Sequence, residues 1–226
     1  MRKKELALEV IRRLKETYPI AECTLDYDQA WKLLVSVRLA AQCTDARVNV
    51  VVEKLYEKYP DVNALADAEP EDIEAIVHPC GLGKSKARDI SACMRILRDK
   101  YDGKVPDDFD ELLALPGVGR KSANLIMGDV FGKPAIVTDT HCIRLCNRIG
   151  LVDGIKEPKK VEMALWKIIP RRRDATTSAI AWSCTGGRLH CQNRSPLRPL
   201  LSFRHLQKKD LTEMMRCRNE GFENKW

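Results

Sequence analysis

The sequence predicts an all-α fold built from many short helices, and three observations support this prediction. Apolar residues recur at intervals of about three or four positions from residue 5 to residue 169. Proline, glycine or a helix-capping residue interrupts these periodic stretches. No stretch alternates apolar and polar residues for long enough to indicate a strand. The pattern therefore favours an assembly of short helices over a bundle of long ones.

The expected helices follow from this periodicity and from the residues at their ends. Residues 5–18 form the first helix, which stops before Pro19 because a proline ring clashes with the preceding helical turn. Asp28 offers an N-cap for the second helix, and Thr44 or Asp45 offers one for the third. The remaining helices are expected at residues 62–68, 71–77, 84–101, 107–113, 118–130, 140–149 and 158–169.

Several ends of these later helices carry their own signals. Pro70 stands at a favourable first-turn position, since it has no backbone amide to leave unpaired. The segment 79–83, PCGLG, interrupts the periodicity, and Asp102 with Gly103 ends the helix that follows it. Asp139 can cap the helix over 140–149. After residue 169 the periodicity is lost, and the chain changes character.

The composition limits the class of protein. The formal net charge is +7, from 39 Lys and Arg against 32 Asp and Glu, which favours an anionic partner without identifying it. Nine cysteines without the regular spacing of a disulfide framework indicate a reducing compartment. There is no signal-peptide core and no run approaching the about 20 apolar residues that span a bilayer. We therefore expect a soluble cytoplasmic chain without a membrane partner.

The most informative segment is LLALPGVGRKSAN at residues 112–124. Gly117 and Gly119 flank Val118 just before a helix opens, and glycine permits close approaches that a side chain would forbid. Unpaired amides and the positive dipole end at the start of that helix suit a phosphate, so the hairpin can hold a DNA backbone without reading bases. An ordinary helix connection with a glycine-rich turn is the alternative for this segment taken alone.

Two further residues change that balance. Lys121 lies in the first turns of the helix after the hairpin, and Asp139 follows about one helix later. A hairpin that holds phosphate would therefore bring a primary amine and a carboxylate towards one sugar. LPGVGRKSAN followed by VTDTHCIRLCNRIGL closely resembles the helix-hairpin-helix DNA glycosylases of the endonuclease III family, and the resemblance extends over residues 5–174.

The resemblance implies two helical domains and an enzyme of base-excision DNA repair. Residues 22–132 would form a six-helix domain with its hairpin at 115–120, and residues 1–21 would join 133–181 in a second domain. Its substrate would be double-stranded DNA with damaged bases, oxidised pyrimidines above all, or abasic sites, bound by a monomer. The activities implied are those of a DNA glycosylase and an abasic-site lyase.

The chemistry that the resemblance implies centres on Lys121. Its amine would attack the sugar carbon of a flipped nucleotide and form a Schiff base, and β-elimination would then nick the strand. Only a neutral amine attacks; burial and the helix N-terminus favour that form, whereas an adjacent carboxylate favours the ammonium. Asp139 is therefore expected to stabilise positive charge on the sugar and to help move protons.

Further DNA contacts follow from the same resemblance. Gln42 matches the family's void-filling glutamine, and Leu82 matches its wedge beside the opposite strand; each also has an ordinary structural reading. His141 approaches phosphate or substrate, or is simply structural. The hairpin residues expected to contact DNA are Gly117, Val118, Gly119 and Arg120.

The C-terminal segment departs from the family. Its relatives carry four cysteines spaced C-x6-C-x2-C-x5-C that bind a 4Fe-4S cluster. Cys184 and Cys191 fit the first spacing, but Arg194 and Leu200 occupy the next two positions and cannot bind iron as thiolates. Shifted reading frames across 182–207 permit cysteine-rich strings. We therefore expect residues 182–226 to be an aberrant, frame-shifted tail, with Cys184 and Cys191 as remnants of the ligand set.

Three other functions stay open at this point. A monofunctional glycosylase of the same fold would lack a lysine at the position of Lys121. A non-catalytic DNA-binding module would use the hairpin for phosphate alone and would give Asp139 no chemical role. An inactive product of a damaged gene would fail to fold cooperatively.

Overall fold

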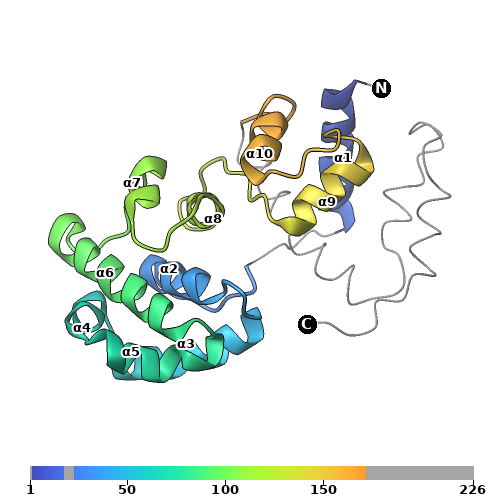
Figure 1. Ribbon diagram of the computed structural model, residues 1–226. Helices are drawn as coiled ribbons and strands as arrows, with labels where there is room; N and C mark the ends of the chain where they lie inside the picture. The colour runs from blue at the N-terminus through green and yellow to red at the C-terminus, as the bar shows by residue number, and fades with distance from the viewer. Residues whose placement is uncertain (1, 18–22, 172–226) are drawn as a thin grey trace, which may run out of the picture. The chain divides into compact units, whose positions relative to one another are not determined.

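The computed structural model describes residues 2–17 and 23–171, and this part of the chain is helical, with no strand in it (Figure 1). The all-α prediction is confirmed. A single 3-10 turn, η1 (His78–Cys80), separates two of the helices. The α-helices are α1 (Lys3–Thr17), α2 (Ala30–Leu39), α3 (Asp45–Lys58), α4 (Val62–Asp67), α5 (Pro70–Val77), α6 (Gly83–Tyr101), α7 (Phe109–Ala114), α8 (Arg120–Asp129), α9 (Thr140–Ile149) and α10 (Pro158–Trp166).

The helix ends follow local chemistry, with one error in the capping prediction. Asp28 does not cap α2: the N-cap is Gln29, without a side-chain capping bond, and Asp28 instead pairs with Lys32 at 2.7 Å. Asp139 does cap α9, since its side chain accepts a hydrogen bond from the amide of Cys142 at 2.7 Å. The expected α9 bounds, 140–149, are those observed.

The helices from α2 to α8 share one hydrophobic core. In it, α6 packs against α4 and α5, and α8 packs against α2 and α7. Leu33, Leu55, Ile73 and Leu97 from four of these helices are fully buried in this core. This packing holds the ends of α2, α6 and α8 in place, and the loops at those ends carry most of the residues singled out from the sequence.

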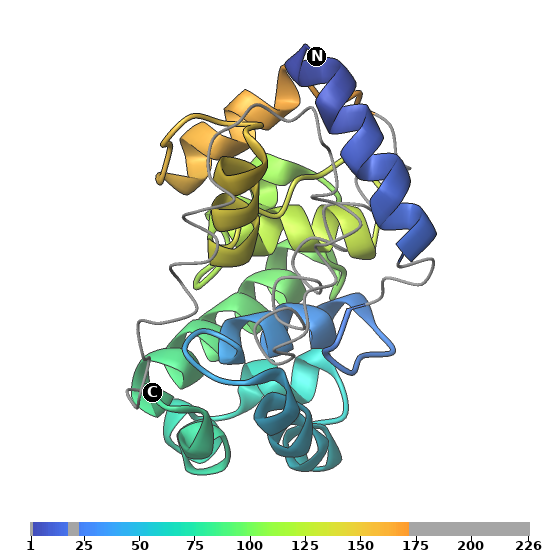
Figure 2. The same cartoon turned by 90° about the vertical axis from the view of Figure 1, so that its right-hand side faces the viewer.

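The helices α1, α9 and α10 bury their apolar faces outside that core, and Figures 1 and 2 show all three at the opposite end of the described part from α3, α4 and α5. Lys3 on α1 forms an ion pair with Asp153 in the segment between α9 and α10. The buried apolar residues of this group include Leu6, Ala7, Val10, Ile11 and Leu14 from α1, Leu145 and Cys146 from α9, and Val161 and Leu165 from α10.

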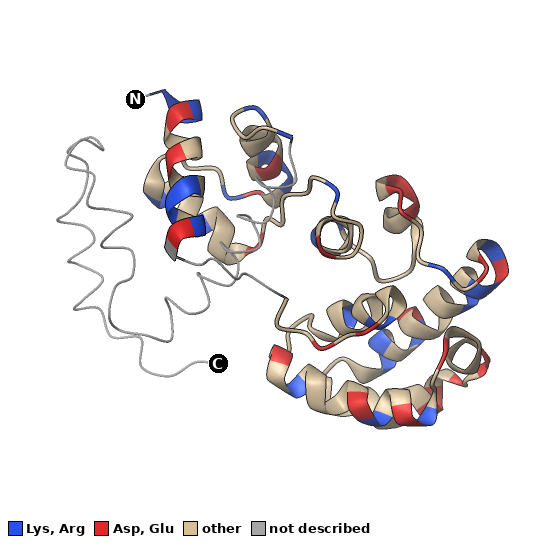
Figure 3. Cartoon of the chain, turned by 180° about the vertical axis from the view of Figure 1, so that it is seen from behind, with Lys and Arg blue, Asp and Glu red and all other residues tan. Residues whose placement is uncertain are grey.

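Charged residues of both signs lie on the same helices (Figure 3). Many form close pairs, such as Arg98 with Asp67 at 2.6 Å and Arg12 with Glu9 at 2.7 Å. Within the described ranges, no helix combines the length and the apolar character that crossing a bilayer requires.

Candidate active site

The predicted hairpin is a tight turn between α7 and α8. The amide of Val118 donates to the carbonyl of Leu115 at 3.2 Å, which closes the turn. Gly117 has a φ of +74°, a conformation that a residue with a side chain rarely adopts. Because Val118 belongs to this turn, α8 begins at Arg120 rather than at 118, the start predicted from the apolar pattern.

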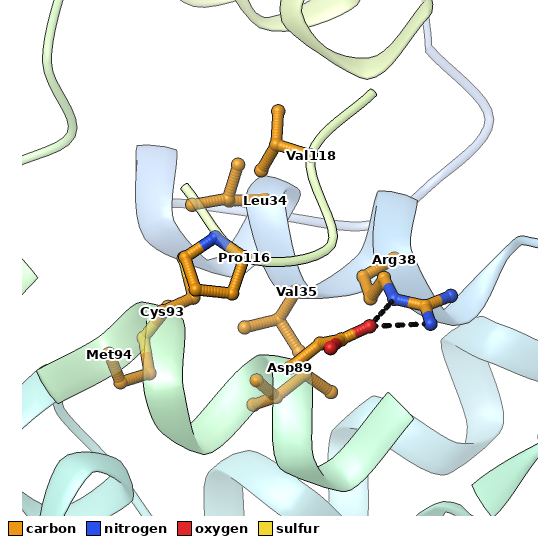
Figure 4. A pocket seen from close by; sticks show the side chains of 9 residues that line it. Leu34, Val35, Arg38, Asp89, Cys93, Met94, Pro116 and Val118 are labelled. Carbon is orange, nitrogen blue, oxygen red and sulfur yellow. Dashed lines mark hydrogen bonds and ion pairs between the residues drawn. The ribbon is translucent and has the colours of Figure 1, made fainter. Parts of the chain in front are cut away.

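The turn rests on a charged pair that sequence reasoning missed. Arg38 on α2 binds Asp89 on α6, with its Nη2 and Nε at 2.6 and 2.8 Å from Oδ2 (Figure 4). A Cβ at Gly117 would lie only 2.7 Å from Cδ of Arg38. Arg38 and Asp89 are 51 residues apart, so no short-range sequence pattern could have paired them. The glycine is required here for packing as well as for its backbone angle.

The start of α8 offers open amides. Among the described residues, none accepts a hydrogen bond from the backbone amides of Gly119, Arg120 or Lys121. A Cβ at Gly119 would meet nothing within 4 Å. Since three amides at a helix N-terminus have no acceptor among the described residues and Gly119 is exposed, this end of α8 is suited to bind a phosphate from outside the protein.

Lys121 is exposed in the first turn of α8. The expectation that burial would favour its neutral form is therefore wrong for the DNA-free chain. Its place in the first turn of the helix after the hairpin is as predicted.

Arg120 makes its side-chain contacts within the protein. Its Nε and Nη2 donate to Glu162 of α10 at 2.7 and 2.9 Å, and its guanidinium lies 4.9 Å from the centroid of the Phe109 ring. Hydrogen bonding to Glu162 raises the pKa of Arg120 above its ordinary value. The Arg120 side chain is thus held by Glu162 while 34% of it stays exposed, and its backbone amide has no acceptor among the described residues.

Asp139 and His141 stand at the first turn of α9. Asp139 is 9% exposed, and one of its oxygens is held by the Cys142 amide at 2.7 Å. His141 is half-buried, and its Nδ1 lies 3.4 Å from Nη2 of Arg144. The cap fixes the Asp139 carboxylate at the helix start.

Gln42 and Leu82 are both exposed, and both have a left-handed backbone, with φ of 58° and 53°. Gln42 lies between α2 and α3, and Leu82 precedes α6. Leu82 is 56% exposed, which is a large fraction for a leucine. The two loops thus present one amide and one apolar side chain to solvent.

The predicted remnants of a cluster site, Cys184 and Cys191, lie outside the described residues, as does the predicted tail at 182–226. Within the described ranges, no group of three or more His, Cys, Asp or Glu side chains could hold a metal ion. The donor chemistry in the sequence also does not fit a 4Fe-4S cluster, because Arg194 and Leu200 occupy two of the four ligand positions.

Comparisons with known proteins identify the family of this chain. A family model described as HhH-GPD superfamily base excision DNA repair protein matches residues 35–171. The endonuclease III of Synechocystis sp. is 45% identical over 170 residues, which are 75% of this chain and 77% of that protein.

Two solved structures of endonuclease III with DNA share the fold at 37% sequence identity. A non-covalent complex has a TM-score of 0.81 and covers 96% of this chain and 100% of its own. A trapped covalent intermediate, an estranged-adenine complex, has a TM-score of 0.82 and covers 95% of this chain and 100% of its own. The chain therefore belongs to the endonuclease III family, within the HhH-GPD superfamily of base excision DNA repair proteins.

Proposed function

We propose that Lys121 is the nucleophile of this enzyme and that Asp139 is its carboxylate partner. As an endonuclease III family member, the chain is a base-excision repair DNA glycosylase with abasic-site lyase activity. The observation that carries the assignment of Lys121 is its position. It is the exposed amine in the first turn of a helix whose open amides suit a DNA phosphate. A relative trapped as a covalent intermediate with DNA supports a covalent mechanism.

The proposed reaction begins with a damaged base leaving the stack, at a cost of a few kcal/mol. Nζ of Lys121 then forms a bond to C1′ of the sugar while the bond to the base breaks. Transfer of a proton from nitrogen to O4′ and cleavage of the C1′–O4′ bond open the sugar and give a protonated Schiff base. Removal of a C2′ proton allows β-elimination, which breaks the C3′–O bond and releases the 3′ phosphate.

In this proposal, Asp139 stabilises the positive charge that develops on the sugar. A carboxylate would favour the ammonium form of Lys121, so it is not the group that makes the amine neutral. One hydrogen bond from the Cys142 amide does not exclude a second task, because a carboxylate has about four acceptor positions. Capping and catalysis can therefore coexist in one side chain.

The hairpin and two loops supply the proposed contacts with double-stranded DNA. The amides near Gly117, Val118, Gly119 and Arg120 would hold one phosphate, with His141 near phosphate or substrate. Gln42 would fill the space that the flipped base leaves, and Leu82 would wedge beside the opposite strand. The exposure of both side chains supports these roles.

The finer features belong to the same proposal. Oxidised pyrimidines and abasic sites are the proposed lesions, and a monomer is the proposed binding unit. The proposed location is the cytoplasm, beside the nucleoid if the source is bacterial. The proposed domains are 22–132 and 1–21 with 133–181, a division supported by the separate core of α2 to α8.

The 4Fe-4S cluster usual in this family does not enter the proposed chemistry, because the printed sequence lacks two of its four ligands. We propose a shifted reading frame as the origin of residues 182–226. Sequencing the DNA across codons 175–210 tests this, and an uninterrupted frame that encodes the printed tail would refute it.

The test of the proposed nucleophile is borohydride trapping on duplex DNA with an abasic site. We expect a covalent protein–DNA adduct with the unaltered chain, none with Lys121→Ala, and an undiminished yield with Lys54→Ala, which removes an exposed lysine on α3. An adduct that persists in Lys121→Ala would transfer the role to another amine. Absence of an adduct with the unaltered chain would favour a monofunctional glycosylase or an inactive product.

A non-catalytic DNA-binding module is not favoured. The homologous endonucleases III match most of the chain, and both Lys121 and Asp139 are present. Such a module would bind DNA without nicking it, so the trapping experiment also separates these two functions.

A further inference from the structure

Lys86 has the largest side chain among those that are fully buried in the described part of the protein. It lies in the first turn of α6, and its exposed fraction is 0%. Burying a lysine requires hydrogen-bond partners, because an isolated ammonium loses its hydration without compensation. None of the functions proposed above uses this side chain.

The partners of Lys86 are two backbone carbonyls from different segments. Its Nζ donates to the carbonyl of Leu39 at 2.8 Å and to the carbonyl of Cys80 at 2.8 Å. Leu39 is the last residue of α2 and Cys80 is the last residue of η1. Carbonyls at helix ends have no partner within the helix, so one lysine satisfies two of them at once.

Each of these carbonyls stands just before a loop proposed to contact DNA. Gln42 follows Leu39 by three positions, and Leu82 follows Cys80 by two. Both loop residues have a positive φ, which non-glycine residues adopt only where the surrounding structure imposes it. The Lys86 side chain therefore joins the two segments whose backbones are held in this unfavourable conformation.

We propose that Lys86 is a positioning residue, which fixes the loops of Gln42 and Leu82 relative to each other so that both side chains enter the duplex together. The inference rests on the proposed roles of Gln42 and Leu82. An apolar side chain could fill the same space, but it would leave both carbonyls without a donor. Through its two hydrogen bonds, Lys86 fixes the position of the loops that carry Gln42 and Leu82 relative to α6.

The surroundings of the ammonium agree with a structural bridge rather than with chemistry. Burial lowers the pKa of Lys86, although the nearby Cys80 and Cys43 thiols act in the opposite direction. Burial also raises the pKa of the Cys80 thiol to about 11, so Cys80 remains protonated at neutral pH. With the Cys80 thiol neutral, the hydrogen bonds to the two carbonyls hold the nitrogen in place.

The test compares two rates in the same preparation of the full chain, under single-turnover conditions. The first is excision of an oxidised pyrimidine from duplex DNA, and the second is cleavage of a duplex with a preformed abasic site. We expect Lys86→Met to slow excision about ten- to a hundredfold, because small displacements of positioned groups have effects of this size. Cleavage of the abasic site should fall much less, since no base has to be extruded.

The ratio of the two rates does not depend on how much of the protein is folded, because both rates scale with the active fraction. Lys54→Met is the matched control: it removes one lysine charge from an exposed position on α3 and should leave the ratio unchanged. Lys86→Arg keeps donors for both carbonyls and should bring the ratio back towards that of the unaltered chain. An unchanged ratio in Lys86→Met would overturn the proposal.

A double-mutant cycle with Leu82→Ala tests whether Lys86 acts through the wedge. If it does, Lys86→Met should add little to the loss of excision already caused by Leu82→Ala, because two residues in one unit are not additive. Full additivity would overturn the positioning role. If neither Leu82→Ala nor Gln42→Ala slows excision, the proposed roles of the loops fail, while Lys121 trapping remains as the separate test of the enzyme's chemistry.

Discussion

Glu162 is a carboxylate with only 3% of its side chain exposed, and its ion pair with Arg120 compensates for the hydration that burial removes. Two hydrogen bonds at 2.7 and 2.9 Å join them, and Trp166 lies 3.4 Å from the same carboxylate. The pair connects α8, which carries Lys121, to α10. This ion pair thus links the helix that carries the proposed nucleophile to a helix that lies outside the core of α2 to α8.

Arg120→Ala should therefore destabilise the protein by about 2 kcal/mol, because it strands a buried carboxylate. The value is below that of a fully buried pair, since the Arg120 side chain is 34% exposed and water screens it. Urea unfolding followed by circular dichroism measures the change. The double variant Arg120→Ala with Glu162→Gln should recover part of the loss; no recovery would mean that packing, not charge, is responsible.

Different substitutions can separate the observed capping of α9 by Asp139 from its proposed catalytic role. Asp139→Asn keeps a preferred N-cap residue for α9, so thermal stability should hardly change while excision and abasic-site cleavage fall sharply. Asp139→Ala should lose activity as well and about 1 kcal/mol of stability, through loss of the bond to the Cys142 amide. Full activity in Asp139→Asn would reduce this residue to a helix cap.

The hairpin between α7 and α8 combines an inner and an outer glycine. Gly117 packs against Arg38, whose guanidinium is fixed by Asp89, whereas Gly119 faces open space. Pro116 and Val118 from the turn line an apolar pocket together with Leu34 of α2. The turn is therefore anchored on its inner side and free on the side from which a phosphate would approach.

Substitution of the two glycines should have opposite consequences. Gly117→Ala should cost about 2 kcal/mol of stability, because L-residues disfavour this backbone region and the new Cβ would meet Arg38. Gly119→Ser should leave stability unchanged, since serine is a preferred N-cap residue, yet lower DNA affinity because its side chain takes the amides meant for phosphate. Thermal melting and fluorescence anisotropy with a duplex measure the two effects.

The helices themselves were largely predictable, because periodicity and end signals are local. The bounds of α9 matched, and Pro70 stands at the first turn of α5 as expected. Errors occur where one local interaction outweighs another. Asp28 pairs with Lys32 instead of capping α2, and the turn at Val118 delays the start of α8.

Over the whole chain, the charged residues are distributed unequally. Residues 182–226 hold nine Lys and Arg against four Asp and Glu, so +5 of the net +7 lies there and +2 remains for the first 181 residues. Because the described helices lie in that nearly balanced part, their affinity for DNA has to come from local features such as the open amides of α8.

Stability should fall at alkaline pH, because a buried thiol keeps its proton up to a higher pH in the folded protein than in the unfolded chain. Burial raises the pKa of Cys93 from 9.0 to about 12. The unfolded chain therefore binds fewer protons above pH 9, and the free energy of unfolding decreases there as pH rises. Between about pH 8 and about pH 10, Cys93 alone should contribute a loss of about 1 kcal/mol.

Urea unfolding at both pH values measures this loss, and Cys93→Ala is the control. That variant is expected to be less stable at pH 8, because it leaves a cavity in the core, but to show a smaller decrease towards pH 10. An equal decrease in both proteins would assign the alkaline effect to other groups.

The sequence by itself determined the all-α class, the order of the helices, the hairpin, and the family motif that contains Lys121 and Asp139. These depend on neighbours in the chain, and local spacing is visible in a sequence. Only the tertiary structure decided that Lys121 is exposed and that Arg120 is bound by Glu162. It also decided that Lys86 joins the helix ends that precede the loops of Gln42 and Leu82. Such contacts join residues 42 and 47 positions apart, and their geometry is set by how helices pack rather than by any local pattern.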